Sequence, residues 1–331
     1  MSDSVLRFGI VGTGGMGGVH AREIHGRRDA RVVALCDTSE QALERAASWF
    51  GPAAADVARH TDLDGMLAAG GLDAVVIATP HTQHAAHIIA ALEHGLHVLV
   101  EKPMATTAAD ARAITARAEA AGRVVAIAYQ RHGSAGYRRA HEAIASGAVG
   151  DLRLVTVLIA QDCLENFIPG RTWRADPALS GGGHFMDTGS HINDMMLWVS
   201  GLEPESVMAH IDNFGTLVDV CSALSIRFRN GAVGTFAATS LSPEWREEFS
   251  FYGTKGVLNI RGDEMRLQVK GQDTVVLRGQ GRDVRPVEDF IATVRGERPA
   301  PQAPPVYGLR VAQVSEAAYK SAQSGRAERV G

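Results

Sequence analysis

The stretch LRFGIVGTGGMGGVHAREI, residues 6–24, begins as an apolar segment, continues as a glycine-rich turn and ends in a helical pattern. Its glycines Gly12, Gly14 and Gly17 have the G-x-G-x-x-G spacing. In dinucleotide-binding folds the first glycine permits a tight turn, the second lets the backbone approach a pyrophosphate, and the third lets the helix pack against the strand. The pyrophosphate sits at the helix N-terminus, where free N–H groups and the helix dipole favour negative charge. The stretch therefore predicts a dinucleotide site.

An acidic residue after the next apolar segment indicates which dinucleotide binds. Residues 31–36 (RVVALC) are typical of a buried second strand, and Asp37 follows them directly. A carboxylate at this point accepts hydrogen bonds from the adenosine ribose hydroxyls and repels a 2′-phosphate. Residues 38–44 contain no Arg or Lys that would bind such a phosphate. The sequence therefore favours NAD over NADP.

Length, composition and charge exclude several functional classes. The 331 residues exceed one comfortable core, so two domains are expected. A net charge of −4 argues against nucleic acid and anionic membrane surfaces as partners, and no apolar run approaches the ~20 residues of a membrane span.

Cys36, Cys163 and Cys221 lie far apart in apolar segments, which indicates reduced core thiols. Since no room precedes the first strand for a signal peptide, we expect a cytoplasmic protein.

Residues 1–130 alternate strand and helix patterns, as in an α/β domain with a doubly wound parallel sheet of the Rossmann type. Helices are predicted over residues 38–50, 83–93 and 108–121, and strands over 73–79, 97–100 and 124–129. Ligands of open parallel sheets bind outside the carboxyl ends of the strands. The residues expected at the cofactor are therefore Gly12, Thr13, Gly14, Gly15, Met16, Gly17, Asp37, Thr79, Pro80, His81, His84, Glu101 and Lys102.

Residues 131–331 form a second predicted domain that is rich in short strands. The Asn230-Gly231 pair between two apolar runs predicts a hairpin, so at least part of this sheet is expected to be antiparallel. Strands are predicted over residues 152–161, 206–213, 221–228, 232–240, 249–253, 257–261, 265–270 and 274–277, and helices over 137–146 and 185–199. A Pro-rich connector covers residues 298–305. The final helix, about 306–324, packs either within this domain or back on the first.

Lys102 follows the strand that ends at Val100 and precedes Pro103, at the edge where the cofactor is expected. A buried or cation-flanked lysine serves in proton transfer, and a charged one polarises a substrate oxygen. Most lysines are solvated surface residues, but the position at a strand end favours a catalytic role. The sequence leaves open whether the Lys102–Pro103 bond is cis.

A second candidate group lies in SGGGHFMDTGSHIND, residues 180–194. Asp187 and His191 are four residues apart, so they share one face of a helix. A carboxylate beside an imidazole raises the pKa of the ring and fixes its tautomer, which suits a histidine that takes a proton from an alcohol. A salt-bridged histidine without catalytic function fits the spacing equally well. The run Gly181–Gly183 is expected to let the backbone lie close to a ligand.

Other polar residues carry weaker signals. His81, His84 and His87 follow each other at i, i+3 and i+6, but no Cys or carboxylate set completes a zinc site, so no metal is predicted. Trp173 and Arg174 precede the glycine run and are suited to stack on or hydrogen-bond a sugar-like ring. A core Trp and a surface Arg explain the same residues.

Taken in order, these motifs resemble the Gfo/Idh/MocA family, named for glucose-fructose oxidoreductase and inositol dehydrogenase. The resemblance covers nearly the whole chain and rests on GIVGTGGMGGVHA, Asp37, ATPHTQHA, VLVEKPMA, GAVGD and WRADPALSGGGHFMDTGSHINDMMLWVSG. It implies that Lys102, Asp187 and His191 form the catalytic group beside the nicotinamide. It also implies a largely antiparallel second sheet with one face commonly buried against another subunit, hence a homodimer or homotetramer.

The same resemblance implies an NAD-dependent oxidoreductase that transfers a hydride between nicotinamide and a secondary alcohol of a cyclic polyol or sugar. The residues expected at the substrate are Lys102, Arg131, Trp173, Arg174, Asp187 and His191. Many family members have an Arg followed shortly by Pro where this chain has Arg131-His132-Gly133-Ser134, so substrate specificity does not carry over at this loop. Two alternatives remain, a redox-neutral glycosidase that keeps NAD bound and a non-enzymatic NAD-binding sensor. The sequence names neither the substrate nor the physiological direction of the reaction.

Overall fold

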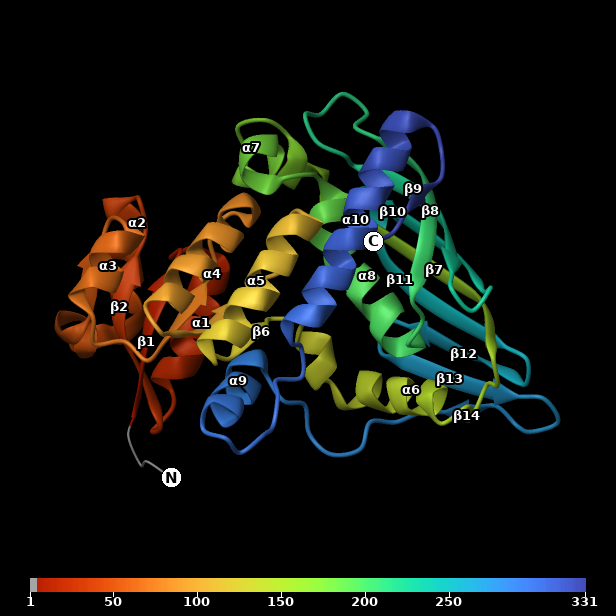
Figure 1. The fold of residues 1–331 in the computed structure, drawn as a ribbon, viewed down its shortest axis with the longest axis horizontal. Helices are drawn as coiled ribbons and strands as arrows, with labels where there is room; N and C mark the ends of the chain where they lie inside the picture. The colour runs from red at the N-terminus through yellow and green to blue at the C-terminus, as the bar shows by residue number, and fades with distance from the viewer. Residues whose placement is uncertain (1–4) are drawn as a thin grey trace. The chain divides into compact units, whose positions relative to one another are not determined.

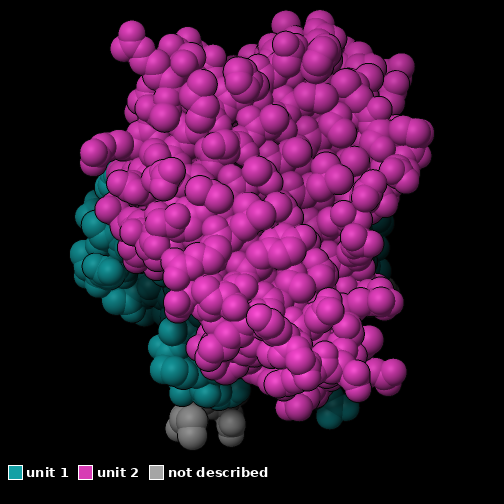
Figure 2. All heavy atoms as spheres, turned by 90° about the vertical axis from the view of Figure 1, so that its right-hand side faces the viewer, with its two compact units in different colours: residues 1–105, 109–129, 285–306 teal, residues 106–108, 130–284, 307–331 magenta. Residues whose placement is uncertain are grey.

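The computed structural model describes residues 5–331, which form two compact units (Figures 1 and 2). The first unit comprises the chain up to Ala105 together with residues 109–129 and 285–306. The second comprises residues 106–108, 130–284 and 307–331. The chain passes from one to the other at 129/130, next to the predicted boundary. Residues 285–306, however, belong to the first unit, whereas the sequence placed them in the second domain.

A six-stranded parallel sheet with the order β3-β2-β1-β4-β5-β6 forms the centre of the first unit. This is the strand order of dinucleotide-binding domains, and it confirms the predicted fold class. The strands are β1 (Leu6–Val11), β2 (Ala30–Cys36), β3 (Ala58–His60), β4 (Ala74–Ile77), β5 (His97–Val100) and β6 (Val125–Ile127). The helices are α1 (Gly15–His25), α2 (Glu40–Ala47), α3 (Leu63–Ala69), α4 (His84–Glu93), α5 (Ala108–Ala121) and α9 (Pro286–Val294), with 3₁₀ turns at Ser48–Asp56 and His81–Gln83.

Local signals explain where α2 and α3 begin. The Ser39 hydroxyl accepts from the Ala42 N–H, and the Asp62 carboxylate accepts from the Gly65 N–H, as N-cap residues do. The α-helix α2 ends at Ala47, earlier than predicted, and continues as a 3₁₀ segment in which Gly51 has a φ of +54°. The sequence missed β3 and α3, because β3 has only three residues and none of them is buried.

The core of the first unit explains why residues 285–306 belong to it. Val287, Phe290 and Ile291 of α9 are fully buried, and their i, i+3, i+4 spacing puts them on one helix face. The Phe290 ring meets the edge of Phe8 of β1 at a centroid distance of 6.0 Å. The two rings are more than 280 positions apart in the sequence. Helical periodicity predicts that α9 has an apolar face, but not which sheet covers it.

The second unit is built on a nine-stranded sheet with the order β14-β13-β12-β11-β7-β10-β9-β8-β15. Only β7 and β10 pair in parallel, so the sheet is mostly antiparallel, as predicted. Its strands are β7 (Leu152–Asp162), β8 (Pro204–Asp212), β9 (Cys221–Phe228), β10 (Val233–Thr239), β11 (Leu241–Gly253), β12 (Gly256–Arg261), β13 (Glu264–Val269), β14 (Val275–Val276) and β15 (Glu328–Arg329). The Asn230-Gly231 turn joins β9 to β10, and Gly231 has a φ of +85°, which confirms the predicted antiparallel pair.

Helices cover one face of this sheet (Figure 1). They are α6 (Ala135–Ala145), α8 (His184–Ser200) and α10 (Pro305–Ser324). The unit also contains the short helix α7 (Pro177–Ser180) and 3₁₀ turns at Gln130–Gly133, Leu164–Phe167 and Trp173–Ala175. Val314, Ala317 and Ala318 of α10 lie in the core of the second unit, so the final helix packs within that unit. Alternate residues of β9 are exposed on the other face, which Figure 2 shows from outside. Trp245 of β11 is 73% exposed.

The cysteines and the helices have the following properties in the structure. All three cysteines are free thiols, and burial raises the pKa of Cys36 to about 11. Such a thiol is protonated at neutral pH and therefore a poor nucleophile. Within residues 5–331, every helix is too short or too polar to span a lipid bilayer.

His97 gives the first unit a testable pH dependence. Its Nδ1 accepts from the Val124 N–H at 3.0 Å, which requires a neutral ring. Burial, with help from Arg123, lowers the pKa of His97 from 6.5. The neutral ring therefore stabilises the fold above pH 6.5, and this contribution decreases as the pH falls below 6.5 toward the lowered pKa.

We expect the His97→Asn protein to lose less stability than wild type between about pH 7.5 and 5.5, since the Asn oxygen still accepts from Val124 without titrating. Urea unfolding of both proteins at each pH provides the measurement. Equal losses in the two proteins would contradict the assignment.

Candidate functional site

The glycine loop between β1 and α1 shows why each glycine is needed. Gly12 has a φ of +88°, and a Cβ there would lie 2.6 Å from the Ala78 carbonyl oxygen. A Cβ on Gly17 would overlap the carbonyl oxygen of Gly12, whereas a Cβ on Gly14 or Gly15 would meet no protein atom within 4 Å. The first and third glycines are thus fixed by the fold itself. The second leaves open space in front of a helix N-terminus, as the approach of a pyrophosphate requires.

The N-terminus of α1 is suited to an anion. Its N-cap is Gly14, no side chain caps it, and its first turn contains no acidic residue. The first N–H groups of the helix are therefore available to an anionic ligand. Met16 in this turn is 44% exposed. These features fit the pyrophosphate of NAD.

Asp37 holds the glycine loop in place. One carboxylate oxygen accepts from both the backbone N–H and the hydroxyl of Thr13, each at 2.9 Å, and the other accepts from the Ser39 N–H at 3.0 Å. A carboxylate has about four acceptor positions, so one remains for a ribose hydroxyl. The sequence predicts the ribose contact, while the contact with Thr13 becomes visible only in the structure.

The ends of β4 and β5 are tied together by His84. This fully buried residue, the first of α4, places Nε2 2.8 Å from the Thr79 carbonyl oxygen and Nδ1 2.7 Å from the Pro103 carbonyl oxygen. Burial lowers the pKa of His84. Both ring nitrogens of His84 thus face protein carbonyls beyond the two strand ends. Contact of His84 with the cofactor stays a prediction.

The neighbouring histidines also contact protein groups. Nδ1 of His87 lies 3.1 Å from the Thr79 hydroxyl, and the His81 ring packs edge-on against His84. Pro80 precedes the 3₁₀ turn that contains His81. Over residues 5–331 the structure contains no cluster of three or more His, Cys, Asp or Glu side chains suited to a metal ion.

Glu101 and Lys102 follow β5 at the carboxyl end of the sheet. The Lys102–Pro103 peptide bond is cis. His20 of α1 donates from Nε2 to the Glu101 carboxylate at 2.7 Å, and both side chains are almost fully buried. Burial alone would raise the pKa of Glu101, but the hydrogen bond and charge of His20, together with Lys102, lower it. Glu101 is therefore an ionised carboxylate beside Lys102.

In the second unit, α8 carries Asp187 and His191 one turn apart. An aspartate from a distant part of the chain caps this helix, since the Asp219 carboxylate accepts from the N–H groups of Gly183 at 2.7 Å and Phe185 at 2.8 Å. The Tyr319 hydroxyl donates to the same carboxylate at 2.6 Å. Burial, followed by the Asp219 charge, raises the pKa of Tyr319 well above 10.

This cap corrects our interpretation of the glycine run. A Cβ on Gly183 would overlap the backbone of Asp219, and a Cβ on Gly182 would overlap the Tyr319 ring. Gly181 has a φ of +70° and ends α7. The sequence predicted that the run approaches a ligand, whereas at Gly182 and Gly183 the absent side chains make room for protein atoms. No local pattern could have identified Asp219 or Tyr319 as the partners.

Asp187 binds an arginine that the sequence singled out separately. Arg174 Nε donates to the Asp187 carboxylate at 2.6 Å, and its guanidinium stacks over the Trp173 ring at 4.5 Å. Asp187 is buried, while the Arg174 side chain is 30% exposed. The structure thus brings three predicted substrate residues together. The exposed part of the guanidinium and the Trp173 ring suit a polar ring-shaped ligand.

Arg131 contacts protein groups in the second unit. Its guanidinium donates to Glu247 at 2.6 Å and lies over the Tyr137 ring, whose hydroxyl also donates to Glu247. The adjacent His132 is buried and lies 2.7 Å from Asp194 of α8. The loop that departs from the family pattern is therefore anchored by the Arg131–Glu247 ion pair and by the His132–Asp194 contact. Arg131 remains a predicted substrate residue, but its known contacts are structural.

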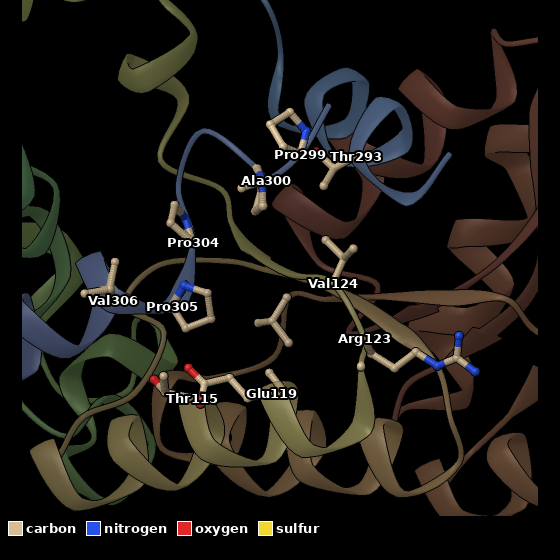
Figure 3. A pocket seen from close by; sticks show the side chains of 14 residues that line it. Thr115, Glu119, Arg123, Val124, Thr293, Pro299, Ala300, Pro304, Pro305 and Val306 are labelled. Atoms are coloured by element: carbon tan, nitrogen blue, oxygen red, sulfur yellow. The ribbon is translucent and has the colours of Figure 1, made fainter. Parts of the chain in front are cut away.

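The first unit contains a pocket of about 440 Å³ (Figure 3). It is lined by the end of α5, the start of β6 and the Pro-rich segment, including Glu119, Val124 and Pro305. This is the amino end of β6, whereas ligands of such sheets bind at the carboxyl ends. We do not assign the cofactor to this pocket.

Known proteins share this arrangement. Residues 6–129 match a model described as an oxidoreductase family with an NAD-binding Rossmann fold, and residues 137–259 match the GFO/IDH/MocA C-terminal domain. A D-glucoside 3-dehydrogenase of Escherichia coli strain K12 is 28% identical over 98% of this chain and 97% of its own length. Inositol 2-dehydrogenase 1 of Saccharopolyspora erythraea is 40% identical over 45% of this chain and 44% of its own length. The crystal structure of the WlbA dehydrogenase from Bordetella pertussis with NADH and UDP-GlcNAcA is 26% identical, covers 99% of both chains and has a TM-score of 0.85.

Proposed function

Because the chain belongs to the Gfo/Idh/MocA family of NAD-binding oxidoreductases, we propose that it oxidises a secondary alcohol of a sugar or cyclic polyol. The coarser assignment, an NAD-dependent dehydrogenase that acts on CH–OH groups, follows from the family and its named dehydrogenases. The similarity to a glucoside dehydrogenase over 98% of the chain supports a sugar ring as substrate. The observation that carries the proposal is the position of Lys102, two residues beyond the end of β5 in the NAD-binding sheet.

When bound, NAD supplies the hydride acceptor. The residues that would hold it are the glycine loop and Asp37, because the loop leaves open space at Gly14 and the carboxylate has a free acceptor position. The backbone at the end of β4 and at Glu101 would complete this side of the site.

The side chains of this protein would handle the proton. We infer that Lys102 hydrogen-bonds and polarises the substrate oxygen while His191 removes the hydroxyl proton. The alternative, in which Lys102 accepts the proton, uses the same residues. Asp187 binds Arg174 tightly, so Asp187 would also orient the guanidinium and the Trp173 ring toward substrate.

Assembly and location complete the proposal. The strands of the nine-stranded sheet expose Trp245, Tyr252 and Val233, and burial of such a surface would favour a homodimer or homotetramer. Three free thiols are typical of a reducing compartment, which supports a cytoplasmic enzyme. The expected partner is a small sugar or polyol.

The direct test is NADH absorbance at mildly alkaline pH with purified protein, NAD and a panel of inositols, aldoses, sugar acids and amino sugars. The proposal predicts NADH formation with one compound class, which is lost in the Lys102→Ala protein. If NAD binds but no compound yields NADH, the proposal fails for that panel. In that case glycoside hydrolysis without net NADH would identify the redox-neutral enzyme, and absence of both would leave a substrate outside the panel or a sensor.

A further inference from the structure

Two buried histidines from different helices hold the three-residue segment that contains Lys102. His20 of α1 binds the side chain of Glu101 at 2.7 Å, and His84 of α4 lies 2.7 Å from the carbonyl oxygen of Pro103. His20 is 3% exposed and His84 is fully buried. One histidine therefore acts on the residue before Lys102 and the other on the residue after it.

The His84 contact extends to the neighbouring strand end. Its second nitrogen lies 2.8 Å from the Thr79 carbonyl oxygen, just beyond β4. A neutral imidazole has a single N–H and donates to one carbonyl, while a protonated ring donates to both. In either state the ring lies between the turns after β4 and β5, and the neutral ring is hydrogen-bonded to one of them.

The His20 contact connects the segment to the dinucleotide loop. His20 lies on α1, whose N-terminus is the glycine loop, and Gly17 packs this helix against Gly12. The Glu101 carboxylate also accepts from the Lys102 N–H at 3.3 Å. A chain of contacts thus runs from the glycine loop through His20 and Glu101 to the Lys102 backbone.

We propose that His20 and His84 are positioning residues for Lys102, which fix the backbone of Glu101–Pro103 so that the amine is held at the carboxyl end of the sheet. The inference rests on the proposed function, in which Lys102 acts on the substrate oxygen. Neither histidine needs to touch the substrate or cofactor. Buried residues that lock the backbone around a reactive group are how a protein achieves the required precision.

Other charged groups near the segment do not replace these contacts. Glu23 of α1 also interacts electrostatically with His20 and with Arg285, but it is a further anion and has no N–H to donate to Glu101. His87 binds the Thr79 side chain and not its carbonyl. The geometry therefore assigns the side-chain contacts at the two ends of the segment to His20 and His84, in addition to the strand hydrogen bond from the Glu101 N–H to the Ile77 carbonyl.

Isosteric substitutions at His84 separate its two contacts. The amide of Asn lies where Nδ1 of histidine lies, so His84→Asn keeps the hydrogen bond to the Pro103 carbonyl. The amide of Gln lies where Nε2 lies, so His84→Gln keeps only the hydrogen bond to the Thr79 carbonyl. We expect His84→Gln to lower kcat by roughly 10- to 100-fold, because a displaced reactive group costs that much. His84→Asn should lower kcat much less. The dissociation constant of NAD should stay nearly constant in both.

The same logic applies to His20. His20→Gln retains a donor at the Nε2 position for Glu101, and His20→Leu removes it at similar size. We expect a large kcat loss in His20→Leu and substantial rescue in His20→Gln. His97→Asn, at the opposite end of β5, serves as the control for substitution of a histidine in this unit.

Hydrogen exchange gives a readout that needs no substrate. In the proteins with NAD bound, the amides of Lys102, Met104 and Ala105 should exchange faster in His84→Gln and His20→Leu than in wild type, His84→Asn, His20→Gln and His97→Asn. Peptides from β6 should not change. Circular dichroism and NAD binding verify that each variant is folded.

The outcomes distinguish this inference from the proposed function. Full activity of Lys102→Ala would overturn the catalytic role of Lys102, and with it the positioning role. If Lys102→Ala is inactive but His84→Gln and His20→Leu retain wild-type kcat, the positioning role is overturned, whatever the exchange rates show. Losses of kcat that His84→Asn and His20→Gln fail to rescue would also overturn it.

Discussion

Lys102→Ala is expected to lower kcat by roughly 10²- to 10⁴-fold, the range by which a positioned proton-transfer group accelerates a reaction. The NAD dissociation constant should change little, because the glycine loop and Asp37 would supply most of the cofactor contacts. Steady-state kinetics with the substrate found in the panel and titration of NAD by fluorescence measure the two effects. Lys255→Ala, which changes a lysine of the turn between β11 and β12, is the matched control.

Lys102→Arg separates the two chemical roles left open for this residue. Arginine stays protonated in proteins, so it can polarise an oxygen but cannot accept a proton. Partial retention of activity in Lys102→Arg, with loss in His191→Asn, would support His191 as the proton acceptor. An Arg variant as inactive as the Ala variant would favour Lys102 itself. Wild-type rates in Lys102→Ala would exclude both mechanisms.

Of two alanine substitutions in the glycine loop, one is expected to lower the stability of the fold and the other the affinity for NAD. Gly17→Ala should destabilise the fold by about 1–3 kcal/mol or more, because its Cβ would overlap the Gly12 carbonyl oxygen and backbone cannot move aside cheaply. Gly14→Ala should leave stability nearly unchanged, since its φ of −74° suits alanine and, among residues 5–331, no atom beyond its chain neighbours lies within 4 Å of a Cβ there. Instead, it should weaken NAD binding by about tenfold or more, because the methyl group occupies space that the pyrophosphate requires.

Urea unfolding measures the stability of both variants, and NAD titration measures their affinity for the cofactor. Each variant serves as the control of the other, since the same chemical change is made three residues apart. A stable Gly17→Ala protein would contradict the packing argument. Undiminished NAD affinity in Gly14→Ala would show that the cofactor does not approach the loop there.

The elements of the first unit were largely readable from sequence because their signals are local. The glycine spacing and the apolar strands that end in Asp37, Pro80 and Glu101 each depend on a few adjacent residues. The parallel order of the sheet then follows from right-handed strand–helix–strand connections. The Asn230-Gly231 hairpin was predictable for the same reason. Weak elements such as β3 were missed because three exposed or half-buried residues have no periodicity.

The candidate site was only partly readable. Lys102, Asp187 and His191 were identified by motif and family resemblance, and their catalytic roles remain predictions. The pairing of Arg174 with Asp187 joins two motifs 13 residues apart that the sequence treated separately. The roles of His20 and Asp219 were missed, because a histidine in a helix and an aspartate in a loop have no distinctive local pattern.

The sequence by itself determined the types and order of most elements, the dinucleotide loop and the antiparallel hairpin, since backbone propensity, apolar periodicity and glycine conformation act over short stretches. Only the tertiary structure decided that α9 completes the first unit, that Asp219 caps the helix of Asp187 and His191, and that His20 and His84 hold the Lys102 segment. Each of these contacts joins residues 19 to more than 280 positions apart. Their partners are selected by burial and by the need to satisfy buried polar groups, and these conditions exist only in the folded chain.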